Sequence, residues 1–153
     1  MIFSTPDPAA DPYFAAALLE LQRTAFAIEA RLIGTREIPP LQQDRDALTA
    51  FRGSWITVWD GVALVGAAAW RSTQEALEID RVMVHPEAHR RGIGSALMDR
   101  IVEAASGRDI RVSTGRDNPP GIALYAKYGF VAESEQEVPP GVWITCLRRP
   151  GSG

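Results

Sequence analysis

The sequence predicts one α/β domain in which a mixed, mostly antiparallel sheet of six or seven strands is flanked by about four helices. Strand-length apolar segments recur along the 153 residues, and amphipathic stretches of helix length separate some of them. Short turns join the first and the last strand segments, which is typical of antiparallel neighbours. A chain of this length can bury one sizeable core, so we expect residues 1–153 to fold as a single domain.

The longest predicted helix begins at Asp11-Pro12, where the acid is the cap and the proline the first helical residue. It runs to about Ile33, because Gly34 is a natural stop. Its apolar residues recur every three or four positions, which fits a helix packed on a sheet or a coiled coil. Strand segments follow, so we expect packing on a sheet through Phe14, Leu18, Leu21, Ala25, Ile28 and Leu32.

Shorter elements surround this helix. Residues 1–3 carry a weak strand signal, and a second short helix is expected over 44–51. A strand is predicted over 54–59, and Asp60-Gly61 is the turn that joins it to a strand over 62–70. We therefore expect an antiparallel hairpin here.

The stretch from Glu78 to Leu97 combines a strand, a glycine-containing loop and the start of a helix. His85-Pro86 ends the strand, because proline cannot donate to a ladder. Gly92 and Gly94 let a ligand approach the backbone, and the helix start offers free N–H groups and a positive dipole end. We therefore expect a phosphate-bearing ligand, bound with help from the neighbouring cationic residues His89, Arg90 and Arg91.

After this helix the chain predicts one strand, one helix and two final strands. A short strand over 110–114 leads to Asn118, which caps a helix that ends at Gly129. The final strands are expected over 130–138 and 141–149.

Composition limits the class of protein. The net charge of −3 argues against a nucleic-acid partner, and no apolar run is long enough to predict a membrane span. The first residues lack the features of a signal peptide, and a lone Cys146 excludes an internal disulfide framework. Leu97 stands where a dinucleotide-binding fingerprint requires a third glycine, and the loop lacks the lysine of a P-loop. We expect a cytoplasmic protein without a metal cofactor.

Two segments resemble motifs of the GNAT N-acetyltransferase family. Residues 85–97 read HPEAHRRGIGSAL, which matches its acyl-CoA motif, and residues 118–130 read NPPGIALYAKYGF, which matches its asparagine-led helix. His89 departs from the usual Gln or Arg, and Gly121 replaces a common alanine and would let a ligand approach closely. The resemblance covers residues 55–147 in element order. It implies a GNAT-like fold and an acetyl-CoA-dependent N-acetyltransferase that moves an acetyl group directly to an amine through a ternary complex.

The resemblance also implies roles for individual residues. The backbone of Val82, Met83 and Val84 would pair with the pantetheine arm of acetyl-CoA. Asn118 would contact that arm, and Tyr125 would protonate the leaving CoA thiolate. The pyrophosphate would be bound, mostly through main-chain N–H groups, by Arg90, Arg91, Gly92, Ile93, Gly94 and Ser95, with His89 at the departing position.

The chemistry itself requires a base and an acid, because an amine with a pKa near 10 must lose a proton before it attacks a thioester. Glu78 matches the general-base position of one branch of the family, and Asp80 follows on the same strand face. Without a catalytic role, Glu78 and Asp80 would only solvate an exposed strand face, and Tyr125 would be an aromatic residue that serves packing.

Several alternatives stay open. Cys146 would serve a covalent route, but it has no neighbouring histidine or helix start, so we expect an inert, half-buried thiol. Glu133, Glu135 and Glu137 share one side of their predicted strand, which we expect to be a solvated edge rather than a site for a cationic acceptor.

The chain would alternatively be a non-catalytic acyl-CoA-binding or regulatory module, or an N-acyltransferase that uses a longer acyl-CoA. The sequence does not identify the amine acceptor, whose pocket we expect near Ile38 to Leu41. It leaves the oligomeric state open, with a homodimer among the alternatives.

Overall fold

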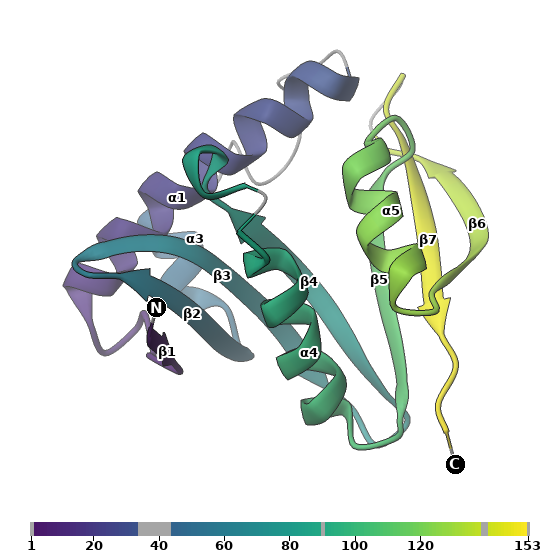
Figure 1. Ribbon diagram of the computed structural model, residues 1–153, viewed down its shortest axis with the longest axis horizontal. Coiled ribbons are helices and arrows are strands. Elements are labelled where there is room, and N and C mark those ends of the chain that lie inside the picture. Colours follow the sequence, from purple (N-terminus) through teal and green to yellow (C-terminus); the bar gives the residue numbers. More distant parts are fainter. Residues whose placement is uncertain (1, 34–43, 90, 139–140, 153) are drawn as a thin grey trace.

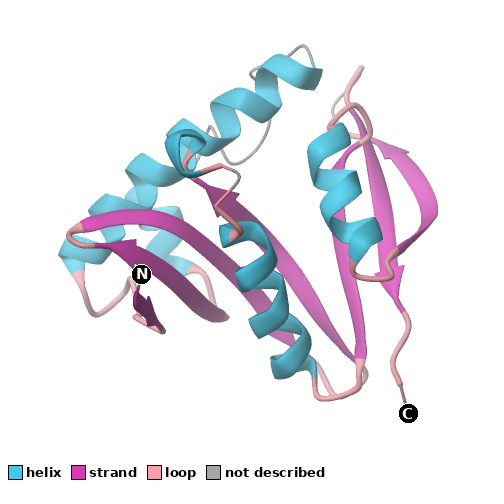
Figure 2. Cartoon of the chain, in the orientation of Figure 1, coloured by secondary structure: helices cyan, strands magenta, loops and turns pink. Residues whose placement is uncertain are grey.

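A seven-stranded mixed sheet organises the computed structural model of the chain, which describes residues 2–33, 44–89, 91–138 and 141–152. The strand order is β1-β2-β3-β4-β5-β7-β6, and every neighbouring pair is antiparallel except β4 and β5 (Figure 1). The predicted sheet is confirmed, and the described residues contain four α-helices (Figure 2). In chain order the elements are β1 (Ile2–Ser4), α1 (Pro12–Ile33), α3 (Arg45–Ala50), β2 (Ser54–Asp60), β3 (Ala63–Ser72), β4 (Ala76–Val84), the 3-10 helix η1 (Pro86–Ala88), α4 (Ile93–Ala105), β5 (Asp109–Gly115), α5 (Pro119–Lys127), β6 (Val131–Glu137) and β7 (Trp143–Arg149).

The predicted cap of α1 is in place, and α3 has a side-chain cap that was not predicted. Asp11 Oδ1 accepts a hydrogen bond from the Phe14 N–H at 3.1 Å, and Asp44 Oδ1 accepts one from the Ala47 N–H at 3.0 Å. These bonds satisfy donors that the helices themselves leave unpaired. The predicted stop at Gly34 lies outside the described residues, as does the connection that follows it.

The turn between β3 and β4 is tighter than predicted. The Thr73 N–H donates to the Ala76 carbonyl at 2.8 Å, and Thr73 Oγ1 accepts from the Ala76 N–H at 3.0 Å. This local closure lets β3 extend to Ser72 and lets β4 begin at Ala76, so both strands are longer than the sequence indicated.

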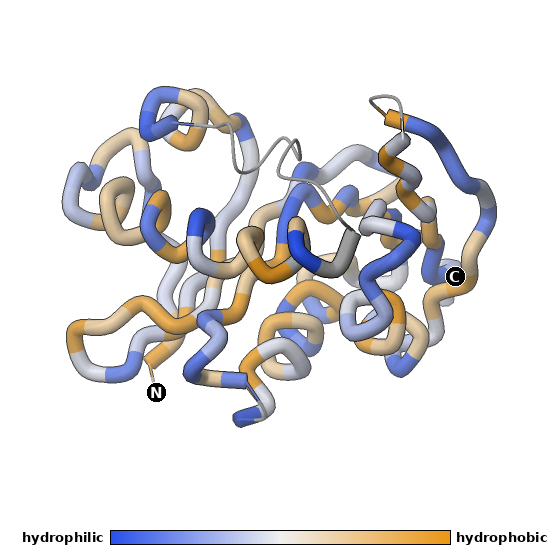
Figure 3. Tube along the Cα trace, turned by 90° about the horizontal axis from the view of Figure 1, so that it is seen from above, coloured by the Kyte–Doolittle hydropathy of each residue, from blue (hydrophilic) through white to orange (hydrophobic). Residues whose placement is uncertain are grey.

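Two hydrophobic cores lie on opposite faces of the sheet. Alternate residues of β3 separate them, since Ala68 belongs to the core under α4 and α5, whereas Ala67 and Ala69 belong to the core under α1 and α3. Figure 1 shows α4 and α5 together on one side of the sheet. Hydrophilic residues mark the edge strand β6, whose seven residues are all exposed (Figure 3).

The long helix α1 packs on the sheet and not in a coiled coil, as the sequence analysis preferred. Phe14, Leu18 and Leu21 are at most 2% exposed and share a core with Trp55 of β2 and Met83 of β4. No helix among the described residues is long and apolar enough to cross a membrane.

The two strands at the centre of the sheet pair only briefly. Residues Ala76–Glu78 of β4 pair with Asp109–Arg111 of β5, although β4 continues to Val84 and β5 continues to Gly115. Figure 1 shows the strands diverging beyond this short paired segment. The far half of β4 therefore pairs, within the described sheet, with β3 alone.

β4 also contains a one-residue bulge at Asp80. Ala69 of β3 pairs with Arg81, whereas the next residue, Trp70, pairs with Ile79, so Asp80 is the extra residue. An extra residue reverses the face that the following side chains occupy. Ile79 is accordingly buried in the core under α4, whereas Arg81 reaches α1 on the other face.

A buried guanidinium group holds this bulge. The Arg81 side chain is 7% exposed, and its Nη1 donates to Gln22 Oε1 of α1 at 2.5 Å while its Nε donates to Asp80 Oδ2 at 2.5 Å. The same guanidinium lies over the rings of Phe51 and Trp55, at 5.6 and 5.5 Å from the ring centroids. These contacts tie β4 to α1, to the end of α3 and to β2.

Replacing Arg81 should therefore destabilise the fold. Arg81→Ala should lower the free energy of unfolding by about 3 kcal/mol, because it leaves the Asp80 carboxylate without its nearest cation. Arg81→Met should cost less, since it keeps an apolar stem of similar length. Urea unfolding measures both, and Arg71→Ala is the control: this exposed arginine approaches the same carboxylate at 3.7 Å, so its loss should cost about 1 kcal/mol or less. Equal losses for the two alanine variants would contradict the role given to Arg81.

Candidate functional site

The free edge of β4 lies directly before the predicted phosphate-binding loop. Val82 and Met83 pair with Ala68 and Ala67 of β3, and β5 has already separated from β4 at this point. Met83 is 1% exposed, and Val82 and Val84 pack against the core under α4. Their side chains therefore serve the fold, and pairing of their main chain with a ligand stays a prediction.

The start of α4 combines a left-handed glycine with close packing on the sheet. Gly92 precedes the helix at φ 74°, a conformation that glycine adopts without strain, and in the described structure no side chain caps the helix there. The first N–H groups of the helix, at 93–95, have no acceptor within the helix. Ile93 is 2% exposed and packs on β3 at Gly66, where an added Cβ would lie 2.6 Å from Ile93 Cγ2. The helix start is thus fixed against the sheet.

The second glycine, Gly94, is not required by the packing of the fold. A Cβ added to it would lie 3.6 Å from Leu124 Cδ2 and 3.9 Å from Val84 Cγ2, which is ordinary van der Waals contact. Alanine would also favour a helix more than glycine does. Packing therefore does not explain glycine at this position, whereas close approach of a ligand to the backbone would explain it.

The cationic residues of the loop differ in their contacts. Arg91 Nη2 forms an ion pair at 2.9 Å with Oδ2 of Asp60, and both side chains are about half exposed. Asp60 is the last residue of β2, because the turn consists of Gly61 and Val62 and not of Asp60-Gly61 as predicted. His89 is exposed and ends η1, and Arg90 lies outside the described residues. The sequence analysis missed the Arg91–Asp60 pair, because nothing local signals a partner 31 positions away.

Asn118 caps α5 as predicted. Its Oδ1 accepts from the Gly121 N–H at 3.4 Å, and its Nδ2 donates to Thr114 Oγ1 at 3.2 Å. Gly121 has a structural reason that the sequence analysis did not find, since a Cβ there would lie 2.7 Å from Asn118 Nδ2 and 3.1 Å from Thr114 Oγ1. The Asn118 cap and Thr114 at the end of β5 therefore require glycine at position 121 even without a ligand.

Tyr125 of α5 and Tyr128, the residue that follows this helix, have different surroundings. Tyr125 is 6% exposed, lies in the core under α4 and α5, and its ring centroid is 5.4 Å from that of Phe130. The Tyr128 hydroxyl lies 2.8 Å from the Ser95 carbonyl and 2.8 Å from Asp99 Oδ1, so it joins α5 to the first turns of α4. Lys127 Nζ adds a hydrogen bond to Ser95 Oγ at 3.0 Å. Ser95 was expected at the site, but these contacts were not predicted.

The two candidate bases also differ. Glu78 belongs to the last residue pair that joins β4 to β5; its side chain is 49% exposed, and its Oε1 lies 3.9 Å from Arg111 Nη1. Asp80 lies at the bulge and contacts Arg81 at 2.5 Å and Arg71 at 3.7 Å. Two guanidinium groups thus contact the Asp80 carboxylate, whereas the half-exposed Glu78 has one distant partner and is the more accessible of the two acids.

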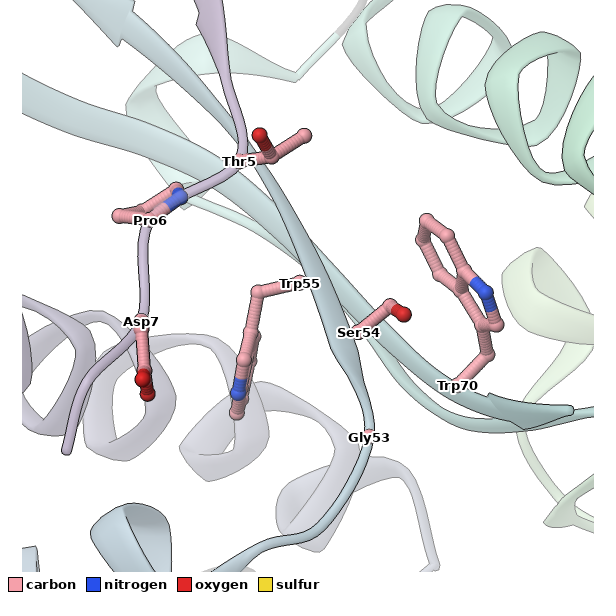
Figure 4. Close-up of a pocket in the computed structure, with 7 residues that line it drawn as sticks. All are labelled: Thr5, Pro6, Asp7, Gly53, Ser54, Trp55 and Trp70. Atoms are coloured by element: carbon pink, nitrogen blue, oxygen red, sulfur yellow. The ribbon is translucent and has the colours of Figure 1, made fainter.

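A separate pocket of about 400 Å³ lies where β1 leads into α1, and none of the predicted site residues lines it. It is lined by Thr5, Pro6, Asp7, Gly53, Ser54, Trp55 and Trp70 (Figure 4). Trp55 Nε1 is buried, and among the described residues it has no hydrogen-bond partner.

The remaining sequence expectations have mixed outcomes. Cys146 is half-buried as expected, 3.5 Å from Ser113 Oγ.

The glutamates of β6 do form a solvated edge, but they do not share one side. A bulge between Ala132 and Ser134 breaks the alternation, so that Glu133 contacts Arg148 whereas Glu135 contacts Arg116. The described residues contain no group of three or more potential metal ligands.

Comparison with known proteins identifies the class of protein. The acetyltransferase (GNAT) family matches residues 15–130, which are more than half of the chain, so the chain belongs to this family. YqkA of Bacillus subtilis is 30% identical over 114 residues, which are 74% of this chain and 33% of YqkA. A mycothiol acetyltransferase of Geodermatophilus obscurus is 32% identical over 124 residues, which are 78% of this chain and 39% of that protein. The chain thus spans only between a third and two fifths of these relatives.

Solved structures share the fold. The structure of yncA from Salmonella typhimurium, determined with its cofactor acetyl-CoA, matches with a TM-score of 0.70 at 19% identity, over 97% of this chain and 92% of that one. The resemblance to a GNAT-like fold is therefore confirmed.

Tyr128 should contribute stability that depends on pH. Burial, followed by the hydrogen bond to Asp99, raises the pKa of Tyr128 above its usual value near 10. A raised folded-state pKa gives stability that is complete below the unfolded pKa and is lost as pH rises through the folded one. Tyr128→Phe should therefore lose about 1 kcal/mol at pH 8, and its deficit against the wild type should shrink above pH 10. Denaturant unfolding across pH 8–11 measures this, and a deficit that grows with pH would contradict it.

Proposed function

We propose that this chain is an acetyl-CoA-dependent N-acetyltransferase that moves the acetyl group directly to an amine in a ternary complex. The observation that carries the proposal is the separation of β4 from β5 beside the start of α4. It leaves one strand edge available to an extended arm, next to N–H groups suited to phosphates. The acetyl-CoA in the yncA structure, which has the same fold, supports this choice of donor.

The donor would lie along β4 toward the short β4–β5 pair. The main chain of Val82–Val84 would pair with the pantetheine arm, and the N–H groups at Gly92–Ser95 would bind the pyrophosphate. Arg91 would contribute mainly long-range charge, because Asp60 holds its guanidinium. The Asn118 side chain already makes hydrogen bonds to Gly121 and Thr114. It would contact the arm only with its remaining donor and acceptor sites, so we expect this contribution to be small.

The acetyl group would then arrive near Glu78, where β4 and β5 meet. Glu78 would accept the proton of the amine, directly or through water, and Tyr125 would protonate the departing thiolate. Direct transfer is supported by the setting of Cys146, a half-buried thiol on β7 that lies 3.5 Å from the Ser113 hydroxyl. We further propose that residues 1–153 form one domain and that the protein is cytoplasmic.

Gly94→Ala is the sharpest test of donor binding. At a hundredfold excess over Kd, acetyl-CoA should stabilise the wild type by about 2.7 kcal/mol, which is a thermal shift of several degrees. The new methyl group fits the unliganded fold, so Gly94→Ala should keep its melting temperature but lose most of that shift. Arg91→Ala should only weaken the shift. No shift for the wild type at millimolar acetyl-CoA would exclude the proposed donor.

A second test separates the base from the acid. Glu78→Gln should lower kcat/KM most at neutral pH and recover partly at alkaline pH, where the amine is already deprotonated. Tyr125→Phe should lower kcat by roughly a hundredfold at every pH, because the thiolate still lacks its proton donor.

The controls for this test are a neighbouring acid and the donor alone. Asp80→Asn should not show the pH-dependent loss, and if it did while Glu78→Gln did not, Asp80 would be the base. Thiol release from acetyl-CoA should require the added amine. A chain that binds acetyl-CoA but releases thiol with no amine in a broad panel would be a binding module instead.

A further inference from the structure

Four charged residues form a row across the middle of the sheet. Arg71 of β3, Glu78 of β4, Arg111 of β5 and Arg148 of β7 are partners in register, each opposite the next. Neighbouring strands lie about 4.8 Å apart, so successive members of the row are close neighbours. Their flanking residues Leu77, Ile79, Ile110, Val112 and Leu147 all belong to the core under α4 and α5. Because side chains alternate, the row lies on the opposite face of the sheet.

The outer arginines of this row are committed to other partners. Arg148 contacts Asp109 at 2.7 Å and Glu133 at 2.6 Å. Arg71 lies 4.7 Å over the ring of Phe51 and approaches Asp80. These contacts leave the two central residues, Glu78 and Arg111, with each other.

The Glu78–Arg111 contact is weak. Its atoms are 3.9 Å apart, beyond hydrogen-bond distance, and the two side chains are 49% and 51% exposed. An exposed ion pair of this kind contributes about 0–1 kcal/mol, so a ligand displaces it at little cost. Both groups also stand at the point where the β4–β5 pairing ends, which is where the proposed function places the acetyl group.

We propose that Glu78 and Arg111 form an acceptor subsite for an amine that carries a carboxylate on a neighbouring carbon atom, as an α-amino acid does. The inference rests on the proposed function. The ammonium group would contact the Glu78 carboxylate that later accepts its proton, and the carboxylate would bind the Arg111 guanidinium through two hydrogen bonds. The half-exposed, weakly paired carboxylate of Glu78 and the equally exposed guanidinium group of Arg111 match the two charges of such an acceptor.

The same row disfavours a polyamine or another acceptor that is only cationic. Such a ligand would find one carboxylate between two arginines, Arg71 and Arg111, and like charges at this spacing repel. An amine without a carboxylate, such as a peptide amino terminus, would bring no anionic partner for Arg111.

The test compares amino acids with their α-amides, which keep the amine and remove the negative charge. The free acids should be acetylated with a kcat/KM at least tenfold above that of the amides, although the amide's amine is the weaker base and is more often deprotonated at neutral pH. Arg111→Ala should raise KM for the acids by roughly ten- to a hundredfold, leave kcat almost unchanged, and leave the amides unaffected. Arg111→Lys should recover part of the loss.

The matched control is Arg116→Ala. Arg116 is also about half exposed and also pairs with an exposed carboxylate, Glu135 at 3.4 Å, but it lies outside the row. Its removal should leave the preference for acids unchanged. Binding provides a second readout, since amino acids should raise the melting temperature of the CoA-bound wild type and not that of Arg111→Ala.

Two results would overturn the inference: amides accepted as well as acids, or equal losses on both from Arg111→Ala. The acetyl-CoA thermal shift, measured on the same samples, keeps this failure separate from failure of the proposed function. A normal shift and turnover of amides or polyamines would reject the subsite alone, whereas no acetyl-CoA shift would reject the donor.

Discussion

The bulge at Asp80, held by the buried Arg81, is the constraint on which the site depends. Uninterrupted alternation would place Ile79 and Arg81 on the same face, and one of them would then be in the wrong environment. The extra residue keeps Ile79 in the core under α4 and directs Arg81 to Gln22 of α1. It occurs just beyond Glu78, where β4 leaves β5, so the change of face and the separation of the strands coincide.

In this arrangement the side chains of the segment pack in the cores, and its main-chain groups are the ones proposed to bind the donor. Met83 and Ile93 are almost fully buried, so their identity serves packing, while the groups proposed to bind the donor are N–H and C=O groups that any residue supplies. Main-chain recognition constrains sequence only where glycine is needed for shape or approach. This is consistent with a fold shared with yncA at 19% identity.

The sequence predicted what local chemistry determines. The predicted caps at Asp11 and Asn118 act within three residues, so the local sequence is enough to indicate them. The bulges at Asp80 and Glu133 were not predictable, because EIDRVMV and VAESEQE both read as regular strands.

Long-range partners were equally invisible in the sequence. Arg81 and Gln22 are 59 positions apart, and Tyr128 and Asp99 are 29 positions apart. Such pairs depend on the register of strands and the placement of helices, which no single stretch of sequence encodes. Gly121 is similar, since its need for glycine comes from the rotamer of Asn118 and the nearby Thr114 hydroxyl.

Net charge gives only a coarse expectation about partners, and the proposed site depends on how the charge is distributed. The chain is acidic overall, yet several of its acids are held by arginines: Asp60 by Arg91, Asp80 by Arg81, and Asp109 by Arg148. Near the β4–β5 junction, Arg81 and Arg148 thus have close carboxylate partners, whereas Glu78 and Arg111 are only in loose contact. A protein whose average charge argues against polyanionic partners can therefore still present one cation and one anion to a small zwitterion, as the proposed subsite would, because recognition at this scale depends on the local pairing.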